Sequence, residues 1–422
     1  MLFRVPTSPA LRSAAALVTT LAALSAAEST TPPTTAAPLP ALRGAQLRLI
    51  DIGVNVMSVA GGSTATDDQL GGLFSGHHDP ARRGFTLQQA ELIMSGAVDP
   101  YFTAAVHILA GEEGFELEDA SASTTSLPAG LQVRAGYFPT EFGRVNAGHP
   151  HLWPWLSKPV AASRFLGADG TRGAGARVSW LAPLPWYSRI LVGAQDAGNE
   201  TAVSFRGLTD EDDDTITVAG RPRIADGVHS AGDLLWLARW ENSLDLGETA
   251  VRLGVSLLTG PNASGDDART RIVGLDLVAK WTAPGARHGY PFLSFEAEAM
   301  QRDYEAVAFD DGVDTFAEAD LRDRGGHAQL LWGVRSGWAV GLRGEAASGS
   351  GESGALAREA DPARDDRVRI APLVMWNPTH FSRLRLEYDY DRFEHDVDGD
   401  DHAHSVWLGL EVQFGAHPTH GF

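Results

Sequence analysis

The sequence predicts an all-β protein: a closed antiparallel transmembrane β-barrel of about sixteen strands. Between residues 383 and 390, Leu and Tyr alternate with Arg, Glu and Asp, so a strand there has one apolar and one charged face. Comparable segments recur along the chain, and we find no helical periodicity that would supply a second layer to cover a sheet of that size. A barrel with lipid outside and water inside accommodates such strands, because closure leaves no backbone group unpaired in hydrocarbon.

The expected strands follow one another from residue 47 to residue 414. They span 47–59, 86–97, 101–110, 115–125, 130–138, 174–182, 187–196, 232–242, 249–258, 271–282, 291–302, 325–335, 338–347, 367–376, 382–393 and 403–414. Alternation stops at Phe414, and a further aromatic residue, Phe422, ends the sequence. Either residue is a candidate for the aromatic signal that barrel-assembly machinery reads.

The connections between these strands mostly alternate between short and long. Short turns carry breaker residues such as Pro100, Gly285 and Pro378. Long connections occupy 60–85, 139–173, 197–231, 259–270, 303–324, 348–366 and 394–402. Because outer-membrane barrels have short periplasmic turns and longer outside loops, the alternation also predicts orientation. The exception is the four-residue connection at 111–114, which falls where an outside loop is expected.

The N-terminal region divides into two segments before the barrel. Arg4 and Arg12 precede an apolar stretch at 14–24 and small residues at 25–27, which is typical of a secretory signal peptide. We therefore expect a signal peptide at 1–27, a disordered Pro/Thr/Ala linker at 28–45 and an outer-membrane β-barrel at 46–422.

Composition excludes several classes of function. The formal net charge is −20 and becomes −22 once a signal peptide containing two of the 34 basic residues is removed, which argues against a nucleic-acid partner. The sequence has no cysteine, so it forms neither disulfides nor thiolate metal sites. It also lacks the Gly-x-Ser-x-Gly and Gly-x4-Gly-Lys motifs. We expect neither enzymatic activity nor a cofactor.

The charged faces of the strands predict which side chains line the lumen. Basic residues outnumber acidic ones there, although the whole chain is acidic, because the surplus acids cluster in loops such as 210–214. The predicted lumen-lining residues are Arg134, Arg177, Arg189, Arg239, Glu241, Arg252, Glu296, Glu298, Arg335, Arg343, Glu345, Arg383, Arg385 and Glu387.

Several short segments from residue 86 onward carry a family resemblance. They are 87–91, 98–102, 129–136, 142–146, 149–154, 179–181, 185–187, 382–386 and 414–422. Through them the chain resembles Gram-negative outer-membrane proteins labelled zinc-regulated, TonB-dependent receptor-like, and more distantly the phosphate-selective porins. The resemblance implies a single porin-like barrel in the bacterial outer membrane, with lipid and lipopolysaccharide around it.

The long connection at 139–173 is the third outside loop of the predicted barrel. In sixteen-stranded general porins, which the chain resembles in strand number, the third loop folds into the lumen and narrows it. The residues expected to form such a channel constriction are Arg144, His149, His151, Trp153, Trp155, Lys158 and Arg164. The alternative is that this loop packs over the barrel mouth or seals a neighbouring wall.

The histidines of this loop also suggest a metal site. His149 and His151 stand two residues apart, and imidazole is the commonest zinc ligand. Zinc needs three or four converging ligands, however, and no spacing in the sequence supplies them. We therefore expect solvated loop histidines and no metal site; the alternative is that these histidines capture a metal ion transiently.

Together these features predict a porin-like channel for passive diffusion of small hydrophilic solutes or ions, narrowed by the third outside loop. A homotrimer is the assembly that the strand number favours. The alternative function is an uptake receptor for zinc or a metal complex. Such transporters have about 22 strands and a plugged lumen, and residues 28–45 are too few to form a plug.

Overall fold

The computed structural model describes residues 50–416, with gaps at 77, 81, 112–113, 208–226, 311, 313–314, 352–363 and 396–398. The predicted signal peptide at 1–27 and the linker at 28–45 lie outside the described residues, and so does Phe422.

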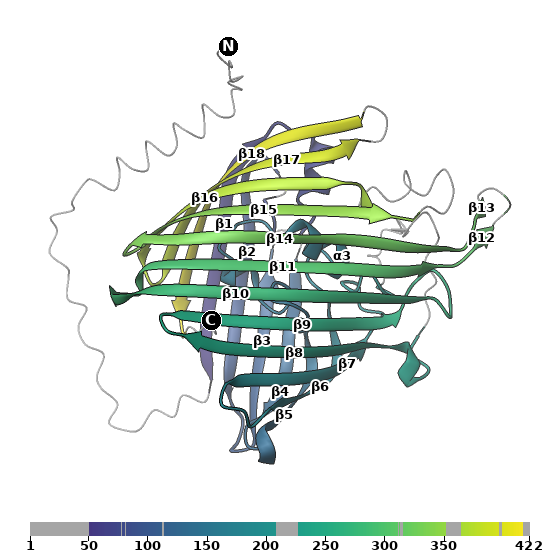
Figure 1. Ribbon diagram of the computed structural model, residues 1–422, viewed down its shortest axis with the longest axis horizontal. Helices are drawn as coiled ribbons and strands as arrows, with labels where there is room; N and C mark the ends of the chain where they lie inside the picture. Colours follow the sequence, from purple (N-terminus) through teal and green to yellow (C-terminus); the bar gives the residue numbers. More distant parts are fainter. Residues whose placement is uncertain are drawn as a thin grey trace, which may run out of the picture.

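The described strands form one closed antiparallel barrel and one small separate pair, β12 (Phe309–Asp310) with β13 (Thr315–Phe316) (Figure 1). The barrel strands are β1 (Asp51–Ser63), β2 (Gly84–Ala97), β3 (Phe102–Ala110), β4 (Phe115–Thr124), β5 (Leu131–Pro139), β6 (Arg172–Leu181), β7 (Tyr187–Asp196), β8 (Leu234–Leu246), β9 (Thr249–Pro261), β10 (Arg269–Arg287), β11 (Tyr290–Ala306), β14 (Ala319–Arg335), β15 (Trp338–Ser350), β16 (Arg367–Thr379), β17 (Ser382–His395) and β18 (Gly399–Gly415). Each corresponds to one predicted segment, so the predicted fold class is confirmed.

The barrel closes where its first and last strands meet. β1 pairs with β18 over a continuous register from Gly53 opposite Gly415 to Ser63 opposite Ser405. No open edge is therefore left between the two ends of the sheet, which is what a sheet surrounded by hydrocarbon requires.

The alternation of the strands places apolar side chains outside and polar ones inside. On β15, Val340 and Leu342 are exposed, whereas Arg343 and Glu345 are buried. At the turn end of the same strand, Trp338 stacks on Trp376 of β16 with ring centroids 5.6 Å apart. Paired aromatic rings near strand ends are typical of barrels at the membrane interface.

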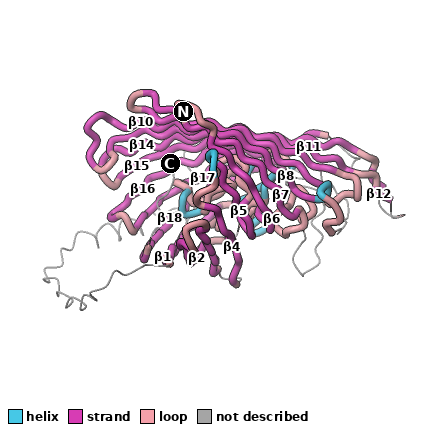
Figure 2. Tube along the Cα trace, turned by 90° about the horizontal axis from the view of Figure 1, so that it is seen from below, coloured by secondary structure: helices cyan, strands magenta, loops and turns pink. Residues whose placement is uncertain are grey.

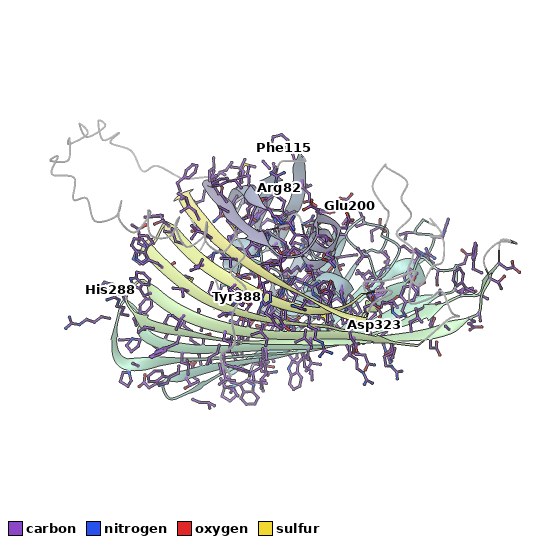
Figure 3. All side chains as sticks on the ribbon, turned by 90° about the horizontal axis from the view of Figure 1, so that it is seen from above. Arg82, Phe115, Glu200, His288, Asp323 and Tyr388 are labelled. Carbon is purple, nitrogen blue, oxygen red and sulfur yellow. The ribbon has the colours of Figure 1, made fainter. Side chains whose placement is uncertain are left out.

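The expectation of no helical segments is wrong in two places. Helices α2 (Asp67–Leu73) and α3 (Val160–Leu166) each span seven residues within long loops, and Figure 2 shows helical segments on the inner side of the curved sheet. Helix α2 begins with a capping box between Thr66 and Gln69, and both helices are too short to produce a helical period in the sequence. No helix in the described part of the chain is long and apolar enough to cross a membrane.

Candidate functional site

The connection between β5 and β6 lies inside the barrel. It contains a 3-10 turn, Pro150–Leu152, and helix α3, and most of its residues from Trp155 to Leu166 are buried. Helix α3 contacts β11, β14 and β15, which belong to the opposite wall. We call residues 140–171 the lumen loop.

Glycines on the inner wall make room for the lumen loop. At each of four of them an added Cβ would lie within 2.9 Å of a loop side chain, closer than real side chains approach. The wall is therefore shaped to receive apolar residues of this loop. The pairs are Gly274 with Phe142 (β10), Gly325 with Ala161 (β14), Gly341 with Trp155 (β15) and Gly409 with Leu156 (β18).

Three predicted lumen carboxylates accept hydrogen bonds from the backbone of the lumen loop. Glu298 accepts two from successive N–H groups at residues 144 and 145, each at 3.2 Å. Glu345 accepts one from Val160 at 2.6 Å. Glu387 accepts one from Leu156 at 2.6 Å and one from the hydroxyl of Ser157 at 2.9 Å. These carboxylates satisfy loop donors that would otherwise be buried unpaired.

Three predicted lumen arginines donate hydrogen bonds to the same loop. Arg343 donates to the carbonyl and hydroxyl oxygens of Ser157 at 2.9 and 2.7 Å. Arg383 donates to the carbonyl of His151 at 2.6 Å, and Arg385 donates to the carbonyls of residues 153 and 155. Six of the predicted lumen residues thus hold the loop in place, which strand alternation alone does not reveal.

The remaining lumen between the loop and the β5–β11 wall contains a cavity of about 990 Å³. Besides Arg343, seven of the predicted lumen residues line it: Arg134, Arg177, Arg189, Arg239, Glu241, Arg252 and Glu296. Five of them are arginines on the consecutive strands β5 to β9, so cationic groups follow one wall of the cavity from strand to strand.

The cavity carries more arginines than carboxylates. Its lining in the described chain includes seven arginines but five Asp or Glu residues. Arg177 and Arg239 pair closely with carboxylates, at 2.7 Å to Glu141 and 2.6 Å to Asp276. Arg189 and Arg252 contact carboxylates only at 3.4 Å or more, and a quarter or more of each side chain is exposed. The positive surplus therefore faces the open part of the lumen.

Only some of the seven predicted constriction residues line the cavity. Arg144, His149 and Trp153 line the cavity, with the Nε of Arg144 2.7 Å from Glu296. The ring of Trp155 borders the same cavity but is almost wholly buried against the β15–β16 wall. The other three do not line the cavity: His151, Lys158 and Arg164.

The positions of these three explain why they do not face the lumen. His151 is buried 2.7 Å from a carboxylate oxygen of Glu91. The Nζ of Lys158 donates to the carbonyl of Gly167 at 2.7 Å, and Arg164 donates to the carbonyl of Asp365 at 2.6 Å. Burial lowers the pKa of Lys158 to about 8 against the opposing effect of nearby carboxylates. Lys158 therefore fixes the fold of the loop itself, whereas His151 and Arg164 attach the loop to other parts of the barrel.

Arg335 is the one predicted lumen residue that the structure places away from the lumen and the loop. It is the last residue of β14, it is exposed, and its guanidinium lies 5.5 Å from the ring centroid of Trp338. The register shifts just before it, so alternation counted along the strand gives the wrong side at this position.

Several lumen residues were missed by the sequence analysis. Asp119 and Glu141 line the cavity beside the arginines, but Glu141 lies in the loop, where strand periodicity carries no information. Glu411 of β18 accepts from Arg385 at 3.0 Å and from Asn55 at 3.1 Å. Its alternation with Leu410 and Val412 was a sufficient signal to find it.

Comparisons with known proteins agree with this architecture. No protein-family model matches the chain. A protein of Aquifex aeolicus (strain VF5), described as uncharacterized, is 29% identical over 374 residues, which cover 84% of this chain and 75% of the relative.

Solved structures of outer-membrane proteins share the fold. The outer membrane channel DcaP of Acinetobacter baumannii has a TM-score of 0.54 and 12% identity, covering 86% of this chain and 96% of its own. OprB of Pseudomonas putida has a TM-score of 0.52 and 10% identity, covering 86% and 94%. A loop-deletion mutant of OmpT from Vibrio cholerae has a TM-score of 0.51 and 9% identity, covering 86% and 99%.

These similarities agree with the porin part of the sequence resemblance and give no support to the TonB-dependent receptor label. The closed barrel, its apolar exterior and its polar interior are the features of proteins in the bacterial outer membrane. The chain is therefore a sixteen-stranded β-barrel of the bacterial outer membrane, with the fold of porins.

Proposed function

We propose that this barrel is a channel, and not an enzyme, through which small hydrophilic solutes and ions diffuse passively, with a preference for anions. The lumen loop narrows the path, and the arginines of β5 to β9 set the charge preference. The observation that carries the proposal is the cavity of about 990 Å³ beside the loop, lined by seven arginines and five carboxylates.

Charge selection in such a lumen follows from electrostatics. Rings and rows of fixed charges in a pore raise the local concentration of ions of opposite sign. Arg189 and Arg252 each present a partly exposed guanidinium, and neither has a carboxylate closer than 3.4 Å in the contacts that the structure gives. We expect the lumen to favour chloride and small organic anions over potassium, even though the whole chain has a formal net charge of −20.

Planar-bilayer recording of the refolded mature chain tests this proposal. We expect discrete single-channel current steps in potassium chloride. Across a tenfold salt gradient, we expect a reversal potential with the sign that an anion-selective channel gives. Absence of steps would contradict the channel. A reversal potential of the opposite sign would leave the channel in place and remove the anion preference.

We also propose a homotrimer surrounded by outer-membrane lipid and lipopolysaccharide. One of the similar structures, OmpT of Vibrio cholerae, is described in a trimer form, at a TM-score of 0.50 and 9% identity. The outer face over β11, β14 and β15 carries small residues, among them Ala297, Ala328 and Gly344, which allow close approach of a second barrel. Because the sequence has no cysteine, single-cysteine variants can test this face by cross-linking; products limited to monomers would contradict it.

A further inference from the structure

We propose that Glu91, His107 and His149 form a binding site for a divalent transition-metal cation such as Zn²⁺ where the lumen loop meets the barrel wall. Glu91 lies on β2, His107 on β3 and His149 in the loop. One ligand atom from each lies within 4.8 Å of the other two. The sequence hides the site because its members come from three segments, and only the topology brings them together.

The distances suit tetrahedral coordination. The same carboxylate oxygen of Glu91, Oε1, lies 3.1 Å from the Nδ1 of His107 and 3.3 Å from the Nδ1 of His149. Zinc binds imidazole nitrogen and carboxylate oxygen at about 2.0 to 2.2 Å. Two ligands of a tetrahedron with that radius lie about 3.4 Å apart, so small shifts would seat a cation between these three atoms.

Neighbouring groups supply a second layer of contacts. The other oxygen of Glu91 lies 2.7 Å from the Nδ1 of His151, a contact that would orient the carboxylate toward the metal. The carboxylate of Glu118 lies 3.1 Å from the Nδ1 of His149. The rings of His107, His149 and His151 are stacked, with successive centroids 4.4 and 5.7 Å apart.

The local charge also favours a cation. Glu91 and Glu118 are both nearly inaccessible to solvent, at 0% and 3% exposure, and burying two carboxylates is costly unless positive charge compensates them. The negative potential of these two buried carboxylates would attract a divalent cation.

A path from the lumen reaches the site. His149 lines the 990 Å³ cavity, and the side chains of His107 and His149 are 13% and 15% exposed. Three protein ligands leave a fourth position for water or a solute group. A metal there would link the loop to β2 and β3, so we expect it to stabilise the loop in its position against the wall.

The experiment measures Zn²⁺ binding to the refolded mature chain in detergent by isothermal titration calorimetry, and Co²⁺ binding by visible absorption. We expect one site per chain, Co²⁺ bands of four-coordinate intensity, and increased resistance of the lumen loop to protease when metal is bound. His107→Gln and His149→Gln should each weaken Zn²⁺ binding at least tenfold and remove the bands.

The matched control is the double variant His402→Gln/His404→Gln, which removes a histidine pair whose ring centroids lie 5.7 Å apart on β18. This control should leave Zn²⁺ affinity unchanged. Circular dichroism and heat-dependent gel mobility verify that each variant is a folded barrel. Folded His107→Gln and His149→Gln variants with wild-type Zn²⁺ affinity would overturn the site, and so would loss of binding in the control alone. Because binding is measured without a bilayer, its outcome is independent of channel activity.

Discussion

The indole of Trp155 occupies the space above Gly341 on the inner face of β15. A Cβ added to Gly341 would lie 2.9 Å from the ring. The ring nitrogen donates to the carbonyl of Ala371 at 2.9 Å, and the guanidinium of Arg343 lies 5.4 Å from the ring centroid. The middle of the lumen loop is thereby attached to β15 and β16, across the lumen from β5 and β6, which the loop connects.

The close approach of Trp155 predicts the effect of enlarging Gly341. Gly341→Val forces the indole away from the wall and should lower the free energy of unfolding by about 1 to 3 kcal/mol, as overpacking does in cores. Gly111→Val, in the turn between β3 and β4, is the control, because an added Cβ there meets nothing within 4 Å. Urea-dependent unfolding in lipid vesicles measures both, and equal effects of the two substitutions would contradict the packing described for Trp155.

Glu387 predicts a second effect on the lumen loop. Glu387→Ala leaves the N–H of Leu156 and the hydroxyl of Ser157 without their acceptor, at a cost of about 1 to 3 kcal/mol for each buried donor left unpaired. We expect the loop to become sensitive to protease while the barrel stays intact. Asp303→Asn, at an exposed ion pair of β11 with Arg271, serves as control; a loop equally resistant in both variants would show that Glu387 does not hold it.

The features of this structure that the sequence predicts are those whose signal lies within a single strand. Strand alternation has a period of two, so Arg343 was assigned to the lumen face of its strand without knowledge of any neighbour, and the structure places it there. The fold followed from many such segments. Only at Arg335, where the register shifts, did counting along the strand fail.

The lumen loop could be predicted only in part. Its length and bulk indicated its place, but the sequence does not encode which of its side chains face water. His151 and Lys158 are buried by contacts with Glu91 and Gly167, and such contacts exist only after the chain has folded. For the same reason the assembly of His107 with His149 was not visible in the spacing of the histidines.

The charge preference of the proposed channel predicts a third result. Arg189→Gln/Arg252→Gln removes two partly exposed cations from the cavity lining, which then has equal numbers of arginines and carboxylates. The reversal potential in a potassium chloride gradient should shift toward the value that a cation-selective channel gives. As a control, Arg271→Gln removes the positive charge of an arginine that does not line the cavity, and it should leave the reversal potential unchanged. A wild-type reversal potential in the double variant would argue against charge selection by Arg189 and Arg252.

The apolar exterior predicts a fourth result. Leu342 is 54% exposed on the outer face of β15, so Leu342→Arg would place a charge in hydrocarbon and should destabilise the barrel by about 2 to 4 kcal/mol. Phe381→Arg, in the turn between β16 and β17, should cost about 1 kcal/mol or less near the interface. Urea titration in vesicles measures the difference, and similar costs at both positions would be inconsistent with lipid around Leu342.

The most direct test of the proposed narrowing is the single-channel conductance after deletion of residues 148–163, compared with the intact chain. This deletion removes most of helix α3 and both Trp153 and Trp155 but leaves the barrel strands complete. If the loop limits the passage of ions, the deletion variant that retains a folded barrel will give larger current steps. Steps of unchanged size would contradict the account, because the loop would then not define the narrowest part of the path.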